Sequence, residues 1–247
     1  MLLIAEILSL IVAGILFWSG FQSIEPPVFT KVSHRYVADD KYWGMPVTLT
    51  EMITPQDIAI QEFVKENSLN TGSPEQRVIK TFDLFERSGV YFYTADSTAT
   101  FSNAVVKFGN FPDLWEFPKF ILAEYKATGK IAVDCETGSM LLTSLFLAEG
   151  VPAREVIGEV DIPNQGIYGH GWCEVNLDGK WYLIESTRGK PLQKFIPTPK
   201  IYKPYFYFTD TYVNALQNVK IEDIEKIHTL TPDGVRALNR YLDSIGL

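Results

Sequence analysis

Three residues of this chain, Cys135, His170 and Glu185, occur in an order that nucleophilic thiol catalysis can use. In such chemistry a cysteine thiolate attacks a carbonyl carbon, and an imidazole moves the protons. A carboxylate beside the imidazole fixes its tautomer and stabilises the imidazolium. The chain therefore holds the residue types of a nucleophile, a base and an orienting acid, and its fold must bring them together.

The local sequence predicts that Cys135 begins a helix. An apolar, strand-like run over 131–133 precedes it, Asp134 is a good N-cap residue, and the Leu-rich segment that follows ends at Gly150. We predict a helix over 135–149, whose apolar residues cover most of its circumference and indicate burial. At a helix N-terminus the dipole favours the thiolate form of a cysteine.

A predicted hairpin brings the histidine and the acid together. Residues 169–175 have strand composition, and Asp178-Gly179 is a strong turn signal before a second strand over 180–185. His170 lies eight residues before Asp178, and Glu185 lies six residues after Gly179. Residues at similar distances from a hairpin turn pair across the ladder, so the two side chains are expected to be near neighbours.

With these motifs the chain resembles the transglutaminase-like superfamily, relatives of the papain-type cysteine peptidases. The matching motifs are Asp134-Cys135-Glu136, Gly150-Val151-Pro152-Ala153-Arg154, His170-Gly171-Trp172, and Trp181-Tyr182-Leu183 with Glu185-Ser186-Thr187. The resemblance implies an α+β papain-like fold, in which the catalytic helix packs on an antiparallel sheet. It also implies acyl transfer through a thioester, with Cys135 as nucleophile, His170 as general base and acid, and Glu185 as the third member of a triad.

Two positions depart from the family pattern. The family usually has Asp where this chain has Glu185, and Ala where it has Gly171. A Glu can contact an imidazole from one methylene further away, so the triad is expected to survive. The backbone N–H of Cys135 is one natural oxyanion donor. Trp115, Asn110 and Gln165 are weak candidates for the second donor.

Two other functions compete with a thiol enzyme. The family resemblance also fits a catalytically inactive binding or assembly module tethered to a membrane. A metal site formed by Cys135, Cys173, His170 and Glu185 is disfavoured, because the chain has no Cys-x-x-Cys pair and strand alternation points Cys173 away from His170. We expect no cofactor and no metal.

The N-terminus predicts a membrane anchor. Residues 2–21 are almost wholly apolar and long enough for one helical crossing, with Phe17, Trp18 and Phe21 clustered at the end. A cleaved signal peptide is the competing interpretation, yet no Lys or Arg precedes the apolar run and no Ala-x-Ala site follows it. The third interpretation of this segment is a buried helix of a soluble domain. We predict a single-pass anchor over 1–22, with the side of the catalytic domain left open.

The rest of the chain is expected to form one domain. We predict a linker and docking segment over 23–50 and a transglutaminase-like domain over 51–247, with core motifs in 82–187. Proline signals predict helices beginning near Thr54-Pro55 and Ser73-Pro74. The net charge of −8 argues against a nucleic-acid partner. The expected substrate is a protein or peptide, including a cell-wall peptide, and the anchor would contact membrane lipid.

Overall fold

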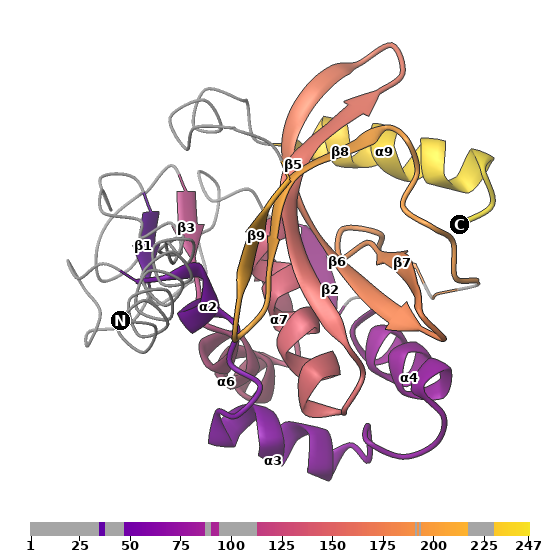
Figure 1. Ribbon diagram of the computed structural model, residues 1–247. Coiled ribbons are helices and arrows are strands. Elements are labelled where there is room, and N and C mark those ends of the chain that lie inside the picture. Colours follow the sequence, from indigo (N-terminus) through magenta and orange to yellow (C-terminus); the bar gives the residue numbers. More distant parts are fainter. Residues whose placement is uncertain are drawn as a thin grey trace, which may run out of the picture.

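The computed structural model describes residues 35–37, 47–86, 90–93, 113–190, 192, 194–216 and 230–247 (Figure 1). The helices are α2 (Leu49–Met52), α3 (Ile58–Glu66), α4 (Pro74–Glu86), α6 (Pro118–Thr128), α7 (Cys135–Ala148) and α9 (Pro232–Ser244). The strands are β1 (Arg35–Val37), β2 (Tyr91–Tyr93), β3 (Asp113–Trp115), β4 (Ile131–Val133), β5 (Ala153–Ile162), β6 (Gly166–Leu177), β7 (Lys180–Ile184), β8 (Tyr202–Phe208) and β9 (Val213–Ala215).

The main sheet has five antiparallel strands in the order β7-β6-β5-β8-β9. Strands β5, β6 and β7 follow one another as hairpins, whereas β8 pairs with the free edge of β5 after a longer connection. Two small parallel pairs, β1 with β3 and β2 with β4, lie outside this sheet.

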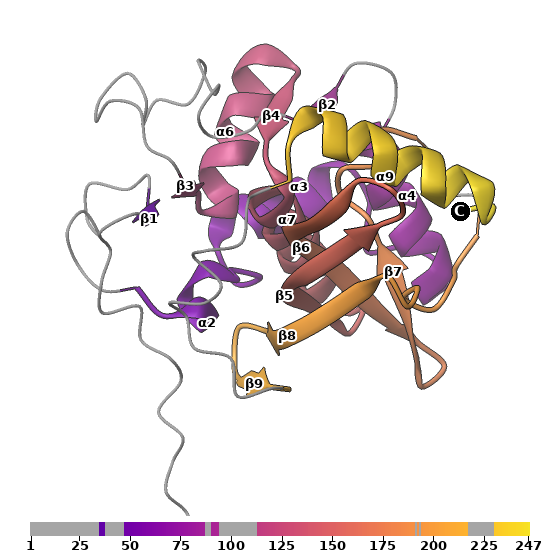
Figure 2. The same cartoon turned by 90° about the horizontal axis from the view of Figure 1, so that it is seen from above.

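The sheet separates two hydrophobic layers. On one face, α3, α4, α6 and α7 pack together with Cys173, Val175 and Ile184 of the sheet. On the other face, α9 covers Val156, Trp172 and neighbouring apolar residues. Figure 1 shows α9 at the upper end of the strands and α3, α4 and α6 at the lower end, and Figure 2 shows the same arrangement from above. The predicted arrangement, a cysteine-bearing helix packed on an antiparallel sheet, is confirmed.

Helix α7 forms for the reasons that the sequence gives. The Asp134 side chain accepts a hydrogen bond from the Thr137 backbone N–H at 3.1 Å and so caps the first turn. Every residue from Cys135 to Phe146 is buried, which agrees with the apolar character expected around its circumference. Gly150, with φ of 77°, follows the helix in the left-handed conformation that ends many helices.

The predicted β6–β7 hairpin is also confirmed. Its turn has positive φ at both central residues, 51° at Asp178 and 79° at Gly179, as a type I′ turn requires. The ladder pairs Leu177 with Lys180 and Cys173 with Ile184. Glu185 therefore follows the last paired residue of β7, on the same side of the sheet as His170.

Two glycines allow close approach of the backbone. A Cβ atom at Gly171 would lie 2.9 Å from Glu136 Cα, so the glycine lets β6 contact the first turn of α7. A Cβ atom at Gly158 would lie 2.3 Å from the Lys203 carbonyl oxygen, at an irregularity in the β5–β8 pairing. The family's usual Ala would not fit at Gly171 without a shift of α7.

The regions flanking the core differ from the sequence prediction in detail. Helix α3 starts at Ile58 behind the N-cap Asp57 instead of near Thr54, because the Asp57 side chain accepts the Ala59 N–H at 2.9 Å. Leu49, assigned by the sequence to the linker, is fully buried in the core. Helix α4 begins at Pro74, as predicted.

The predicted anchor over 1–22 lies outside the described residues. Within the described part of the chain, no helix is both long and apolar enough to cross a bilayer.

Candidate functional site

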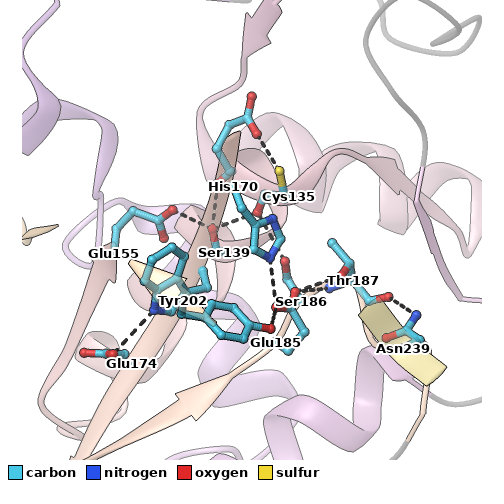
Figure 3. Close-up of polar contacts among 12 residues, drawn as sticks. Cys135, Ser139, Glu155, His170, Glu174, Glu185, Ser186, Thr187, Tyr202 and Asn239 are labelled. Carbon is cyan, nitrogen blue, oxygen red and sulfur yellow. Dashed lines mark hydrogen bonds and ion pairs between the residues drawn. The ribbon is translucent and has the colours of Figure 1, made fainter. Parts of the chain in front are cut away.

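Cys135, His170 and Glu185 meet where the first turn of α7 lies against β6 and the end of β7. All three are buried, with exposed fractions of 1%, 3% and 1%. Figure 3 shows the imidazole between the cysteine on one side and Glu185 with Tyr202 on the other. The fold thus gathers the three residues that the sequence singled out.

The Cys135 thiol is held by its immediate neighbours. It donates to Glu136 Oε2 at 3.0 Å, and it also forms a hydrogen bond with the backbone of Gly171. Burial raises the pKa of the thiol well above its usual value, and the carboxylates of Glu136 and Asp134 raise it further, whereas the Gly171 backbone lowers it. In this arrangement the thiol is protonated, contrary to the expectation from the helix dipole alone.

His170 and Glu185 form a buried pair. The imidazole Nε2 lies 2.9 Å from Glu185 Oε2, and both side chains are fully buried. His170 Nδ1, on the other edge of the ring, has no hydrogen-bond partner within the part of the chain that the structure describes. The ring is therefore fixed at Nε2 while Nδ1 remains available.

Glu185 is surrounded by donors. Oε2 accepts from the Tyr202 hydroxyl at 2.7 Å as well as from His170, and Oε1 accepts from the Thr187 N–H at 3.0 Å and its hydroxyl at 2.8 Å. Burial alone would raise the pKa of this carboxyl. The electrostatic interaction with His170 and the hydrogen bonds outweigh burial, so the pKa of Glu185 lies below the usual value.

The ionised carboxylate determines the tautomer of the neutral imidazole. A carboxylate can only accept hydrogen bonds, so Nε2 must carry the ring proton that points at Glu185. Nδ1 then presents a lone pair. This is the state that a base needs in order to take a thiol proton.

A second polar cluster fixes the backbone of Cys135. Its carbonyl oxygen lies 2.8 Å from Ser139 Oγ and 3.2 Å from Ser186 Oγ. Ser139 Oγ is also 2.5 Å from Glu155 Oε1. Burial raises the pKa of Glu155 well above its usual value, whereas the hydrogen bond from the Ser139 hydroxyl lowers it. The contacts hold the first turn of α7 in place.

The weak candidates for a second oxyanion donor have different outcomes. Gln165 is exposed in the β5–β6 turn, and at about 3.3 Å per residue it lies roughly 16 Å along the strand from His170. That candidate is wrong. Trp115 is buried in the cluster that contains Phe206 and Phe208. Asn110 lies outside the described residues.

Cys173 lies apart from the site, as predicted from strand alternation. It is fully buried in the cluster between the sheet and α7, together with Val175 and Ile184. Over the residues that the structure describes, no group of three His, Cys, Asp or Glu side chains could hold a metal ion.

Sequence reasoning did not find Tyr202, which bonds to Glu185, or Glu155, which bonds to Ser139 of α7. Tyr202 comes from β8 and Glu155 from β5, and neither belongs to a local motif with a chemical signal. Their positions depend on strand pairing over long sequence separations. The aromatic sequence of β8 gives no indication that one of its hydroxyls reaches Glu185.

Comparison with known proteins finds likeness at the level of structure. No protein-family model matches the sequence, and no curated protein matches it. Calcium-bound LapG from Legionella pneumophila is 14% identical, with 74% of this chain and 97% of that chain covered and a TM-score of 0.44. The periplasmic domain of TgpA from Pseudomonas aeruginosa, bound to ethylmercury, is 15% identical, with 60% of this chain and 54% of that chain covered and a TM-score of 0.37.

A TGase structure is 14% identical over 76% of this chain and 40% of that chain, with a TM-score of 0.31. The aligned segments thus span about half or less of the TgpA and TGase chains. Since all three TM-scores are below 0.5, the function proposed below rests on the geometry of the site.

Proposed function

We propose that this protein is a transglutaminase-like thiol hydrolase, a peptidase or amidase that transfers acyl groups through a thioester on Cys135. The observation that carries the proposal is the His170–Glu185 pair. It holds Nε2 at 2.9 Å and leaves Nδ1 unpaired among the described residues, at the edge of the ring that faces Cys135. A neutral imidazole held in this tautomer is suited to take a thiol proton.

The reaction begins when the thiol leaves Glu136 and turns toward the imidazole. His170 Nδ1 takes the proton, and the Cys135 sulfur attacks the carbonyl carbon of a peptide or carboxamide. The imidazolium then returns the proton to the leaving nitrogen as the C–N bond breaks, which gives an amine or ammonia and a thioester. Water attacks the thioester with His170 as base and releases a carboxylic acid. An amine in place of water gives transamidation by the same steps.

Glu185 assists both the formation and the hydrolysis of the thioester. Its charge stabilises the imidazolium that forms when His170 holds the thiol proton. The bonds from Thr187 and Tyr202 keep the carboxylate ionised and in place. The thiol is only 1% exposed, so a substrate reaches it after neighbouring groups move.

The proposed setting is a membrane surface. The apolar run over 1–22 would anchor the chain, and the substrate would be a protein or peptide within reach of that surface, including a cell-wall peptide. Fractionation of the full chain and of a chain lacking residues 1–22 tests the anchor. Recovery of both forms in the soluble fraction would contradict it.

Cysteine labelling tests the chemistry. Once the thiol turns from Glu136 to His170, a thiolate–imidazolium pair forms. Iodoacetamide labelling of the full chain across pH, read by mass spectrometry, should therefore show Cys135 reacting below the ordinary thiol pKa of about 8.5 and slowing in His170→Ala. Peptide pools incubated with the protein should be cleaved by wild type and by Cys173→Ala, the matched control, and not by Cys135→Ala. Labelling unaffected by His170→Ala, together with no cleavage, would overturn the proposal.

One observation favours a second function, an inactive binding or assembly module. The thiol is bonded to Glu136, and burial with adjacent carboxylates raises its pKa. A module of this kind would keep its partner binding in Cys135→Ala. An enzyme would lose turnover in the same variant, so this one substitution separates the two functions.

A further inference from the structure

We propose that Tyr202 is a further positioning residue of the site, whose hydroxyl fixes Glu185 and whose ring flanks His170. The inference rests on the proposed function, since it assigns Tyr202 to the same reaction. Tyr202 is 4% exposed and comes from β8, on the far side of β5 from the strand that carries His170.

The hydroxyl completes the hydrogen bonding of the carboxylate. It donates to Glu185 Oε2 at 2.7 Å, the oxygen that His170 Nε2 also contacts at 2.9 Å. The opposite oxygen accepts two bonds from Thr187. Four donors on two oxygens occupy the directions that a carboxylate offers. The carboxylate cannot turn without losing at least one of these bonds, so the oxygen facing the imidazole stays where it is.

The Tyr202 ring lies beside His170, the other member of the buried pair. The centroid of the Tyr202 ring lies 5.9 Å from that of the His170 imidazole and 5.1 Å from that of Trp172. Trp172 in turn stacks with His170 at 6.0 Å. The imidazole is thus confined by two rings, and its rotation about the Cβ–Cγ bond would push it against one of them. Tyr202 contacts both the base and the acid through different ends of one side chain.

The protonation states of Tyr202 and Glu185 make the Tyr202 hydroxyl the hydrogen-bond donor of the pair. Burial and the Glu185 charge raise the pKa of the phenol well above its usual value, so the hydroxyl holds its proton at all physiological pH values. Glu185 is held ionised by the same contacts. The polarity of the bond is therefore fixed, with the phenol donating and the carboxylate accepting. This in turn requires the proton on His170 Nε2, because Oε2 can only accept.

The same strand offers a matched control. Tyr207 is also in β8, and its hydroxyl accepts a solvent-exposed hydrogen bond from Asn214 Nδ2 at 2.6 Å. Tyr202→Phe and Tyr207→Phe each remove one hydroxyl and keep the ring. Only the first removes a contact with Glu185.

Two readouts on the purified full chain test the proposal. The ¹⁵N chemical shifts of the His170 ring report which nitrogen carries the proton, and the resonance is assigned by its loss in His170→Ala, since the chain has three histidines. Wild type and Tyr207→Phe should show the Nε2–H tautomer. In Tyr202→Phe the carboxylate can turn away from the imidazole, so the population should shift toward Nδ1–H. Iodoacetamide labelling of Cys135 at pH 7 should slow by about 10-fold in Tyr202→Phe, the size expected for one lost bond to a charged group.

Thr187→Val is a second variant that keeps the test decisive if Tyr202→Phe does not fold. It removes one donor from the other carboxylate oxygen without touching a ring, and it should move both readouts in the same direction. Unchanged ring shifts and labelling rates in both variants would overturn the role of Tyr202. A changed tautomer in a protein that cleaves no peptide would support the positioning role and contradict the proposed function, so the two can fail separately.

Discussion

Two buried carboxylates near opposite ends of α7 have opposite ionisation states. Glu185, beside the N-terminal end, accepts four hydrogen bonds, and its pKa lies below the usual value. Glu149, directly after the C-terminal end, accepts one bond at Oε1 from the Thr81 hydroxyl at 2.5 Å. Its Oε2 has no partner among the described residues, and burial raises its pKa to about 8.

The comparison shows that burial by itself does not decide whether a carboxylate is charged. The exposed fractions are 1% for Glu185 and 2% for Glu149, so the loss of water is similar. Four hydrogen-bond donors, His170 among them, replace the lost water at Glu185, whereas Glu149 has too few donors to hold a charge. The orienting acid of the proposed triad is thus ionised because of its specific contacts.

The two residues give opposite pH dependence of stability. The folded-state pKa of Glu185 is depressed, so its contribution is present above its unfolded pKa and is lost as pH falls through the folded value. The folded-state pKa of Glu149 is raised, so its contribution is complete below its unfolded pKa and is lost as pH rises toward about 8.

The largest effect is expected from Glu185→Gln. An amide has one oxygen and one NH₂ group, so it cannot accept from two donors at each end. The free energy of unfolding at pH 7 should fall by about 2–4 kcal/mol through the unsatisfied donors. Thiol-dependent turnover should fall by at least about 100-fold, because the imidazole loses the group that fixes its tautomer. Chemical denaturation and peptide cleavage measure the two changes.

The control for that substitution is Glu159→Gln, which changes a half-buried carboxylate bonded to Lys203 away from the triad. Equal losses in the two variants would show that Glu185 has no special role.

A gain in stability is expected from Glu149→Gln. The amide removes the need to protonate a carboxyl on folding. The stability of the variant relative to wild type should therefore rise by about 1–3 kcal/mol between pH 5 and pH 8. Urea denaturation at several pH values measures this difference. A flat difference across that range would mean that Glu149 is ionised in the folded protein.

The smallest effects distinguish the single donors to each carboxylate. Thr187→Val removes a bond to the ionised Glu185 and should cost about 1.5–3 kcal/mol at pH 7, whereas Thr81→Val removes a bond to the neutral Glu149 and should cost about 0.5–1.5 kcal/mol. Denaturation of the two variants in parallel measures both costs. The reverse order of costs would contradict the assigned ionisation states.

The local sequence predicted the elements that carry the proposed triad. Asp134 before Cys135 indicated a capped helix, and Asp178-Gly179 indicated a hairpin that brings Glu185 to His170. Such signals depend on contacts between residues close in sequence, so they can be read without the fold. The predicted start of α3 is wrong, because Pro55 and Asp57, two residues apart, both act as helix start signals and the Asp57 cap decides.

The sequence by itself determined the order and identity of the reactive residues, the capped helix and the tight hairpin, because these follow from local backbone preferences. Only the tertiary structure decided that Tyr202 reaches Glu185, that Glu136 holds the thiol, and that Glu185 is ionised while Glu149 is neutral. The physical reason is that the number of donors around a buried group depends on how distant strands and helices pack. Neither spacing nor composition encodes that number.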